Sequence, residues 1–253
     1  KTFNIIPVDA TRNALYDSLM AAKDGDVLEL IEAADYKLDS LLFIDKTITI
    51  RAADGLDSKP VLKNVNPDLT TRYIISIKTG GHLTLKGLDL DGNAGSSVPA
   101  KYLLRTAESV EGLYNLFVDD CILHDVVSAS DGNFFRAYSD AFADTVKFTN
   151  CVLYNSGKEG IRIKDVDNSV NYFEMSNSTM YNTRGEGIYV QGNKVVFRIN
   201  HCTFNRLGYF YTDMIRPRYV IDAEIKNSVF SNTPEPHSRT RPDPHRFQAG
   251  KRR

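Results

Sequence analysis

A pattern of ten positions recurs along the chain, in which apolar and polar residues alternate around a central small residue. It reads apolar, any, apolar, two polar positions, a small residue or Cys, any, apolar, any, and then Asn or Asp. Apolar residues at every second position predict a β-strand with one buried face. The copies begin at Leu83 (a looser match), Leu116, Val146, Phe173, Phe197 and Ala223.

The spacing of these copies predicts the fold. Successive central positions are separated by 33, 30, 27, 24 and 26 residues, which is typical of stacked coils whose loops differ in length. One copy cannot bury its apolar face alone, whereas coils stacked in register about 4.8 Å apart can. We therefore predict a right-handed parallel β-helix, an all-β solenoid, over residues 1–233. The central positions are Leu88, Cys121, Cys151, Ser178, Cys202 and Ser228.

A second family of strands precedes the repeated pattern, at residues 134–138, 160–164 and 187–191. Gly160 and Gly187 lie 27 residues apart, which matches the local coil length. Each coil is thus expected to contain at least two strands and a bend. Asn155 and Asn182 end equivalent strands, where Asn tolerates a left-handed backbone or stacks in a ladder.

The two ends of the predicted solenoid differ. Residues 11–22 predict an amphipathic capping helix, with Leu15, Leu19 and Met20 at helical spacing and Thr11 or Asp9 as the N-cap. Residues 234–253 contain four prolines and six basic residues, and they predict an exposed tail. An open C-terminal end suggests self-association, a covering partner or further coils.

The composition narrows the choice of partners. The 31 basic and 32 acidic residues nearly cancel, so nothing favours a nucleic acid. No apolar stretch approaches the roughly 18 to 20 residues of a membrane span. The three cysteines occupy the small position of the repeat, so we interpret them as packing residues. The chain opens on Lys1 rather than Met, which weakly favours an exported protein that is secreted, periplasmic or on the cell surface.

Residues 155–230 resemble the family 6 polysaccharide lyases, which are parallel β-helices that include alginate lyases and chondroitinase B. The stretch from Asn155 to Ile163 is similar to that family's Asn-Gly-Gly-Glu-x-x-Arg stretch. Gly185-Glu186 is similar to the start of its Gly-Glu-x-Glu motif, and Lys194 follows a few residues later. The resemblance implies an acidic, uronate-containing polysaccharide as the ligand, with its cleavage by β-elimination as a candidate activity.

In that family, elimination from a uronate uses a Ca²⁺ ion on the carboxylate, a Lys base and an Arg that assists the leaving oxygen. The resemblance therefore implies Ca²⁺ as the cofactor. The sequence departs from the motif because the second Glu is Ile188, and Gln191 fits an alternative alignment of the Lys. The implied site comprises Asn155 and Glu186 as metal ligands, Lys194, Arg216 and Arg218 as catalytic residues, and Glu159, Arg162, Tyr189 and Tyr211 as substrate contacts.

Other interpretations of the same residues remain open. Asp119-Asp120 and Arg162-Ile163-Lys164 imitate motifs of polygalacturonase-like hydrolases, but that family's Asn-Thr-Asp and Gly-His-Gly motifs are missing. Glu159 and Arg162 also fit the solvent-facing side of a strand, and Glu186 fits a surface pair with Arg184 or Lys158. The alternative function is a non-catalytic glycan-binding or structural β-helix domain of an exported bacterial protein.

Overall fold

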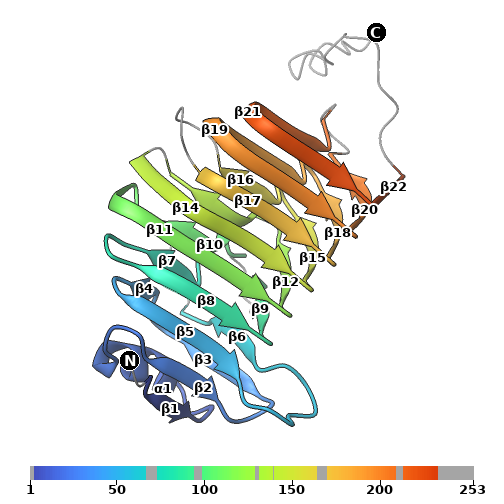
Figure 1. Ribbon diagram of the computed structural model, residues 1–253. Helices are drawn as coiled ribbons and strands as arrows, with labels where there is room; N and C mark the ends of the chain where they lie inside the picture. Colours follow the sequence, from blue (N-terminus) through green and yellow to red (C-terminus); the bar gives the residue numbers. More distant parts are fainter. Residues whose placement is uncertain are drawn as a thin grey trace, which may run out of the picture.

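The chain winds into a parallel β-solenoid of about six turns, with one short helix near its N-terminus (Figure 1). The computed structural model describes residues 3–66, 73–93, 99–128, 131–138, 140–163, 170–208 and 213–232. Successive turns stack from the N-terminal to the C-terminal end, so the predicted parallel β-helix is confirmed. The tail at residues 234–253 lies outside the described residues.

Each turn contributes strands to three faces of the solenoid, and every strand pairs in parallel with its counterpart in the next turn. The first face comprises β1 (Ile5–Val8), β2 (Val27–Leu30), β5 (Thr47–Ala52), β8 (His82–Lys86), β11 (Ser109–Asp119), β14 (Asp140–Thr149), β17 (Val170–Ser176) and the second halves of β19 (Ile188–Asn200) and β21 (Ile215–Lys226).

The second face is a separate sheet of eight strands. It comprises β3 (Asp35–Leu38), β6 (Val61–Asn64), β9 (Asp89–Asp91), β12 (Ile122–Val126), β15 (Val152–Ser156), β18 (Thr179–Thr183), β20 (Thr203–Leu207) and β22 (Val229–Ser231).

The third face is joined to the first through β19, whose first half pairs with β16 and whose second half pairs with β17. It comprises β4 (Leu42–Ile44), β7 (Ile75–Ile77), β10 (Tyr102–Thr106), β13 (Asn133–Ala137), β16 (Ile161–Ile163) and the first halves of β19 and β21.

A ladder of small residues lines the bend between the first and second faces. The Val152 amide donates to the Cys121 carbonyl, and the Thr179 amide donates to the Cys151 carbonyl one turn later. All three cysteines are buried and unpaired, as expected for packing residues. The residue before each small position has a left-handed backbone, as at Gly87, Asp120, Asn150, Asn177, His201 and Asn227.

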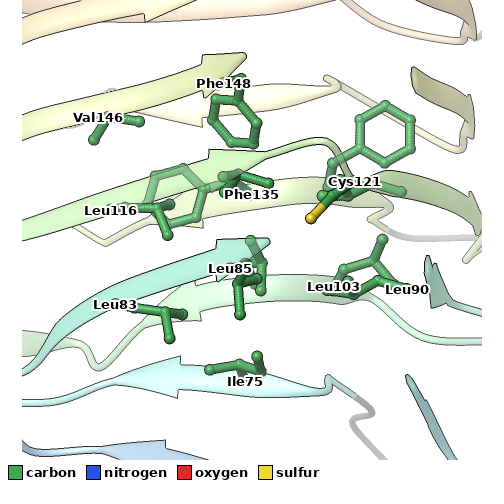
Figure 2. Close-up of a cluster of buried hydrophobic side chains, with 14 of the residues drawn as sticks. Ile75, Leu83, Leu85, Leu90, Leu103, Leu116, Cys121, Phe135, Val146 and Phe148 are labelled. Carbon is green, nitrogen blue, oxygen red and sulfur yellow. The ribbon is translucent and has the colours of Figure 1, made fainter. Parts of the chain in front are cut away.

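The interior consists of apolar side chains stacked from turn to turn. Figure 2 shows Leu83, Leu116 and Val146 above one another, as the register of β8, β11 and β14 requires. Farther along the same row, the rings of Phe173 and Phe197 stack with centroids 5.2 Å apart. Because inward residues alternate with outward ones, each outward position also forms a row along the solenoid.

The N-terminal helix α1 (Ala14–Ala21) packs against the first strands and covers that end of the core. It is shorter than the predicted 11–22, and Asn13 rather than Thr11 or Asp9 is the N-cap. The Asn13 side chain accepts a hydrogen bond from the Asp39 amide, so it fixes the helix to β3 and does not cap the helix. Leu19 is buried, but Met20 is 62% exposed because it lies on the outer side of α1.

The last described turn exposes apolar side chains at the opposite end. Ile221, Val229 and Phe230 are among them, at 66%, 59% and 37% exposure. The prediction of self-association or further coils at this end stays a prediction. No helix within the described ranges is long and apolar enough to cross a membrane.

Candidate functional site

The third face carries a row of cationic side chains at one register position. Arg105 pairs with Arg136, and Arg136 pairs with Arg162. Tyr189 and Arg216 continue the row on the next two strands. Parallel strands lie about 4.8 Å apart, so these side chains are evenly spaced along the solenoid axis. We call these five residues the arginine row.

A second row of polar residues runs beside the arginine row, three residues earlier in each turn. Asn133, Glu159 and Glu186 are at most 5% exposed. Glu159 Oε1 lies 2.9 Å from Arg162 Nη1, and Glu186 Oε1 lies 3.0 Å from Arg216 Nη1. A buried carboxylate stays charged only with such a partner, so each arginine both neutralises a carboxylate and is fixed by it.

Tyrosine rings hold the guanidinium groups from their flat sides. Arg105 lies 4.9 Å from the ring centroid of Tyr73 and 4.3 Å from that of Tyr138. Arg136 lies 4.8 Å from the Tyr138 ring and 5.6 Å from that of Tyr102. Burial, together with a hydrogen bond to Tyr138, raises the pKa of Tyr102, so this ring stays neutral beside the cations. Stacking uses the faces of the guanidinium groups, and part of their in-plane donor set contacts the chain itself: Arg105 Nε donates to the Thr106 carbonyl, and Arg136 Nη1 donates to Asp131.

The structure brings part of the implied catalytic set together. Arg216 and Arg218 lie 5.0 and 5.9 Å from the Tyr189 ring centroid, and Glu186 contacts Arg216. Lys194 is exposed at the corner where β19 passes from the third face to the first. The catalytic roles of Lys194, Arg216 and Arg218 stay predictions, as do the substrate contacts of Glu159, Arg162 and Tyr189, and Tyr211 lies outside the described residues.

Asn155 lies near the end of β15, where its backbone is left-handed with φ of 61°. Its amide nitrogen donates to Asp125 at 2.7 Å, and its amide oxygen accepts from Asn182 at 3.2 Å. The side chain therefore belongs to a ladder of polar residues on successive turns, as the strand-end pattern predicted.

The ion pairs also correct the surface interpretation. Glu159 and Arg162 form a pair that is largely shielded from solvent, because Glu159 is only 5% exposed and its Oε1 lies 2.9 Å from Arg162 Nη1 on the outer side of β16. Lys158 lies 3.5 Å from Asp131 Oδ1, while Glu186 is held by Arg216.

The hydrolase-like motifs are separated in space. Asp119, at the end of β11, accepts hydrogen bonds from Thr149 and Asn150, each at 2.8 Å. Asp120 lies 2.8 Å from the Lys59 amine at the same bend. Arg162 is on the third face instead, so these groups do not converge on one site.

The residues around Glu186 do not fit a Ca²⁺ site. Ca²⁺ is bound in proteins by about six to eight oxygen ligands. Glu186 is engaged by Arg216, and Ile188, at the position of the motif's second Glu, is fully buried in the core. A group of three possible metal ligands within the described part of the chain lies elsewhere, on the second face. It comprises Asp91, His124 and Asp125, whose ligand atoms all lie within 4.8 Å of one another.

His124 is the centre of that second-face group. Its Nε2 lies 2.9 Å from Asp89 Oδ1, and its Nδ1 lies 2.9 Å from Asp125 Oδ2. Burial alone would lower the pKa of His124, but the contacts to Asp89 and Asp125 and the charge of Asp91 outweigh it and raise the pKa to about 9. The imidazolium thus links β9 to β12, and both ring nitrogens are engaged.

Sequence reasoning missed two features, and the sequence contains a signal for one of them. Arg105, Arg136, Arg162, Tyr189 and Arg216 are separated by 31, 26, 27 and 27 residues, close to the coil length. Aligning the chain on that period would have predicted the arginine row. The His124 cluster had no such signal, because its contacts depend on side-chain direction at a bend.

Comparison with known proteins supports this fold. A solved structure of the PL6 family alginate lyase AlyGC superimposes with a TM-score of 0.66 and 20% sequence identity, covering 90% of this chain and 40% of that chain. An arginine-to-alanine mutant of AlyGC gives a TM-score of 0.64 with the same identity and coverage. The chain thus spans less than half the length of that enzyme, and at this identity the likeness shows the fold alone.

No curated protein matches the chain. The protein family described as a domain of unknown function (DUF4957) matches residues 34–183. This match covers more than half of the 253 residues, and the chain therefore belongs to that family.

Proposed function

We propose that the chain binds an acidic, uronate-containing polysaccharide along the arginine row. The observation that carries this proposal is the in-register alignment of Arg105, Arg136, Arg162 and Arg216 on one outer face. A guanidinium binds a carboxylate through two parallel hydrogen bonds, and a polyuronate presents carboxylates at regular intervals along an extended chain. A row of cations along the solenoid axis is complementary to such a ligand.

The charges of this face also favour an anion. The described residues of this face include the cations Arg105, Arg136, Lys158, Arg162, Arg216 and Arg218. Carboxylates among the described residues that contact them include Asp131, Glu159, Glu186 and Asp213. The whole chain has a net charge of −1, so the gathering of these cations is a local property of the face. Local positive potential attracts a polyanion even where the net charge does not.

Cleavage by β-elimination is the finer form of the proposal. Arg216 or Arg218 would hold the uronate carboxylate, and Lys194 would remove the C5 proton beside it. The C4–C5 double bond would form as the C4–O glycosidic bond breaks, and the protonated Lys194 or water would return a proton to the leaving oxygen. A non-catalytic glycan-binding role is the second candidate, favoured by the corner position of Lys194 and by the existing pairing of Arg216 with Glu186. Both candidates imply an exported protein, because such polymers lie outside the cell.

The test is equilibrium binding to alginate, polygalacturonate and a neutral polymer such as dextran, measured by calorimetry. Arg105→Gln and Arg218→Gln each remove one charged donor, and we expect each to weaken acidic-polymer binding about tenfold. Arg51→Gln is the matched control, because Arg51 pairs with Glu29 on the first face. Failure of the unsubstituted protein to bind any acidic polymer contradicts the proposal.

Cleavage is tested separately by the ultraviolet absorbance of unsaturated uronates. A rise that disappears in Lys194→Ala while binding persists supports elimination. A flat trace with intact binding supports the non-catalytic candidate.

A further inference from the structure

We propose that Arg216 serves as the cation of this site in place of a metal ion, so that uronate binding does not require divalent cations. This inference rests on the proposed function and specifies how its site neutralises the ligand. It follows from the contacts of Glu186, whose carboxylate is neutralised by Arg216 and not by a metal ion.

The contacts of Arg216 define the arrangement. Its Nη1 lies 3.0 Å from Glu186 Oε1, and its Nε lies 3.3 Å from Asp213 Oδ2. Its guanidinium carbon lies 5.0 Å from the Tyr189 ring centroid. One cation thus lies between two carboxylates and offsets part of their charge.

The environment of Arg216 keeps it charged. Burial alone would lower the pKa of Arg216, but the hydrogen bond to Glu186 and the nearby charge of Asp213 outweigh burial and raise it. A guanidinium has five N–H donors, and the two carboxylates engage two of them. The remaining donors are enough for a bidentate contact to a ligand carboxylate.

The other two positions of the motif that would supply metal ligands are not available for this role. Ile188 points into the core and is fully buried, so this position supplies no oxygen. The Asn155 amide is engaged by Asp125 and Asn182 in the ladder of the second face. Within the described ranges, the metal-ligand group of three side chains lies at Asp91, His124 and Asp125 and does not include Glu186, which therefore lacks there the set of oxygen ligands that Ca²⁺ takes from a protein.

The test is calorimetric binding of short uronate oligomers, which do not gel with Ca²⁺, in EDTA and in CaCl₂. We expect affinities that agree within about twofold in the two buffers, and at least tenfold weaker binding in Arg216→Gln. Arg216→Lys keeps the positive charge and is expected to bind with intermediate affinity, because an ammonium cannot make the bidentate contact. Thermal unfolding of each variant shows whether it is folded.

Three outcomes separate the two proposals. Equal affinity in both buffers, lost in Arg216→Gln, supports the inference. Binding that is lost in EDTA and restored by Ca²⁺ overturns the inference while the proposed function stands. No binding in either buffer refutes the proposed function, and the inference falls with it.

Terbium luminescence gives a second readout that does not depend on the oligomer. Tyr189 lies beside Arg216 and would sensitise a Tb³⁺ ion bound at Glu186. We expect the unsubstituted protein to show no Tb³⁺ signal that Glu186→Gln removes. A signal that is displaced by Ca²⁺ and lost in Glu186→Gln overturns the inference.

Discussion

The pairing of His124 with two carboxylates predicts a specific pH dependence of stability. The pKa of His124 is about 9 in the folded chain, compared with 6.5 for an ordinary His. Because the folded pKa lies above the unfolded one, the stabilisation is fully present below about pH 6.5 and is lost as the pH rises through about 9. The relevant window is therefore pH 6.5 to 9.

The size of the effect follows from the shift. One pKa unit corresponds to about 1.4 kcal/mol, so the shift of His124 corresponds to about 3 kcal/mol in the free energy of unfolding. The His124 side chain is 13% exposed, so water screens its pairs with Asp89 and Asp125 only weakly. For a chain of this size, about 3 kcal/mol shifts the unfolding midpoint by roughly 6–12 °C.

The assay is thermal unfolding, followed by circular dichroism, at pH 6 and pH 9.5. We expect His124→Gln to lower the midpoint strongly at pH 6 and much less at pH 9.5. His82→Gln is the matched control, because His82 contacts the Asn115 amide 3.1 Å away rather than a carboxylate. Equal midpoint losses at both pH values for His124→Gln would refute the reasoning.

Three further predictions follow from the packing of the turns. Gly187→Ala places a methyl group 2.5 Å from Leu207 Cδ1, and we expect overpacking to destabilise the chain by about 1–3 kcal/mol in urea unfolding; an unchanged midpoint contradicts this. Burial raises the pKa of Cys151 to about 12, so we expect iodoacetamide at pH 8 not to alkylate Cys151 until the chain unfolds. Mass spectrometry that detects modified Cys151 in the native protein would contradict this. Asn182→Ala removes an Asn with a left-handed backbone and its 3.2 Å hydrogen bond to Asn155, and we expect it to lower the free energy of unfolding in urea by about 1–3 kcal/mol. Asn182→Gly should lower this free energy less, because Gly adopts the left-handed backbone without strain. A larger loss for Gly than for Ala would contradict the role of the left-handed backbone.

Much of the fold could be predicted because the repeat imposes it locally. The small positions at Cys121, Cys151 and Ser178 follow residues with left-handed backbones, and a left-handed residue precedes the central position of every copy. A period-two strand pattern between such bends has few alternatives to stacking in register. The helix was predicted in place, but its N-cap was not, because the Asn13 side chain contacts Asp39, which directly follows β3 and lies 26 residues along the chain.

The site could be predicted only in part. Glu186 and Arg216 were expected at one site, and the structure places them 3.0 Å apart. The burial of Glu159 and the position of Lys194 at a corner depend on where each bend falls, which the residue pattern does not determine. Arg136 lies within a strand pattern that was recognised, yet its role in a row emerges only once neighbouring turns are aligned.

The central claim is that arginines on the third face bind the carboxylates of a polyuronate. The most direct measurement compares binding of an oligogalacturonate with binding of its methyl ester, which keeps every sugar ring and removes only the charges. We expect esterification to abolish binding to the unsubstituted protein. For the double variant Arg105→Gln/Arg218→Gln, which has already lost most of its affinity, we expect the acid and the ester to bind almost equally weakly. Equal binding of the acid and the ester by the unsubstituted protein would contradict the claim.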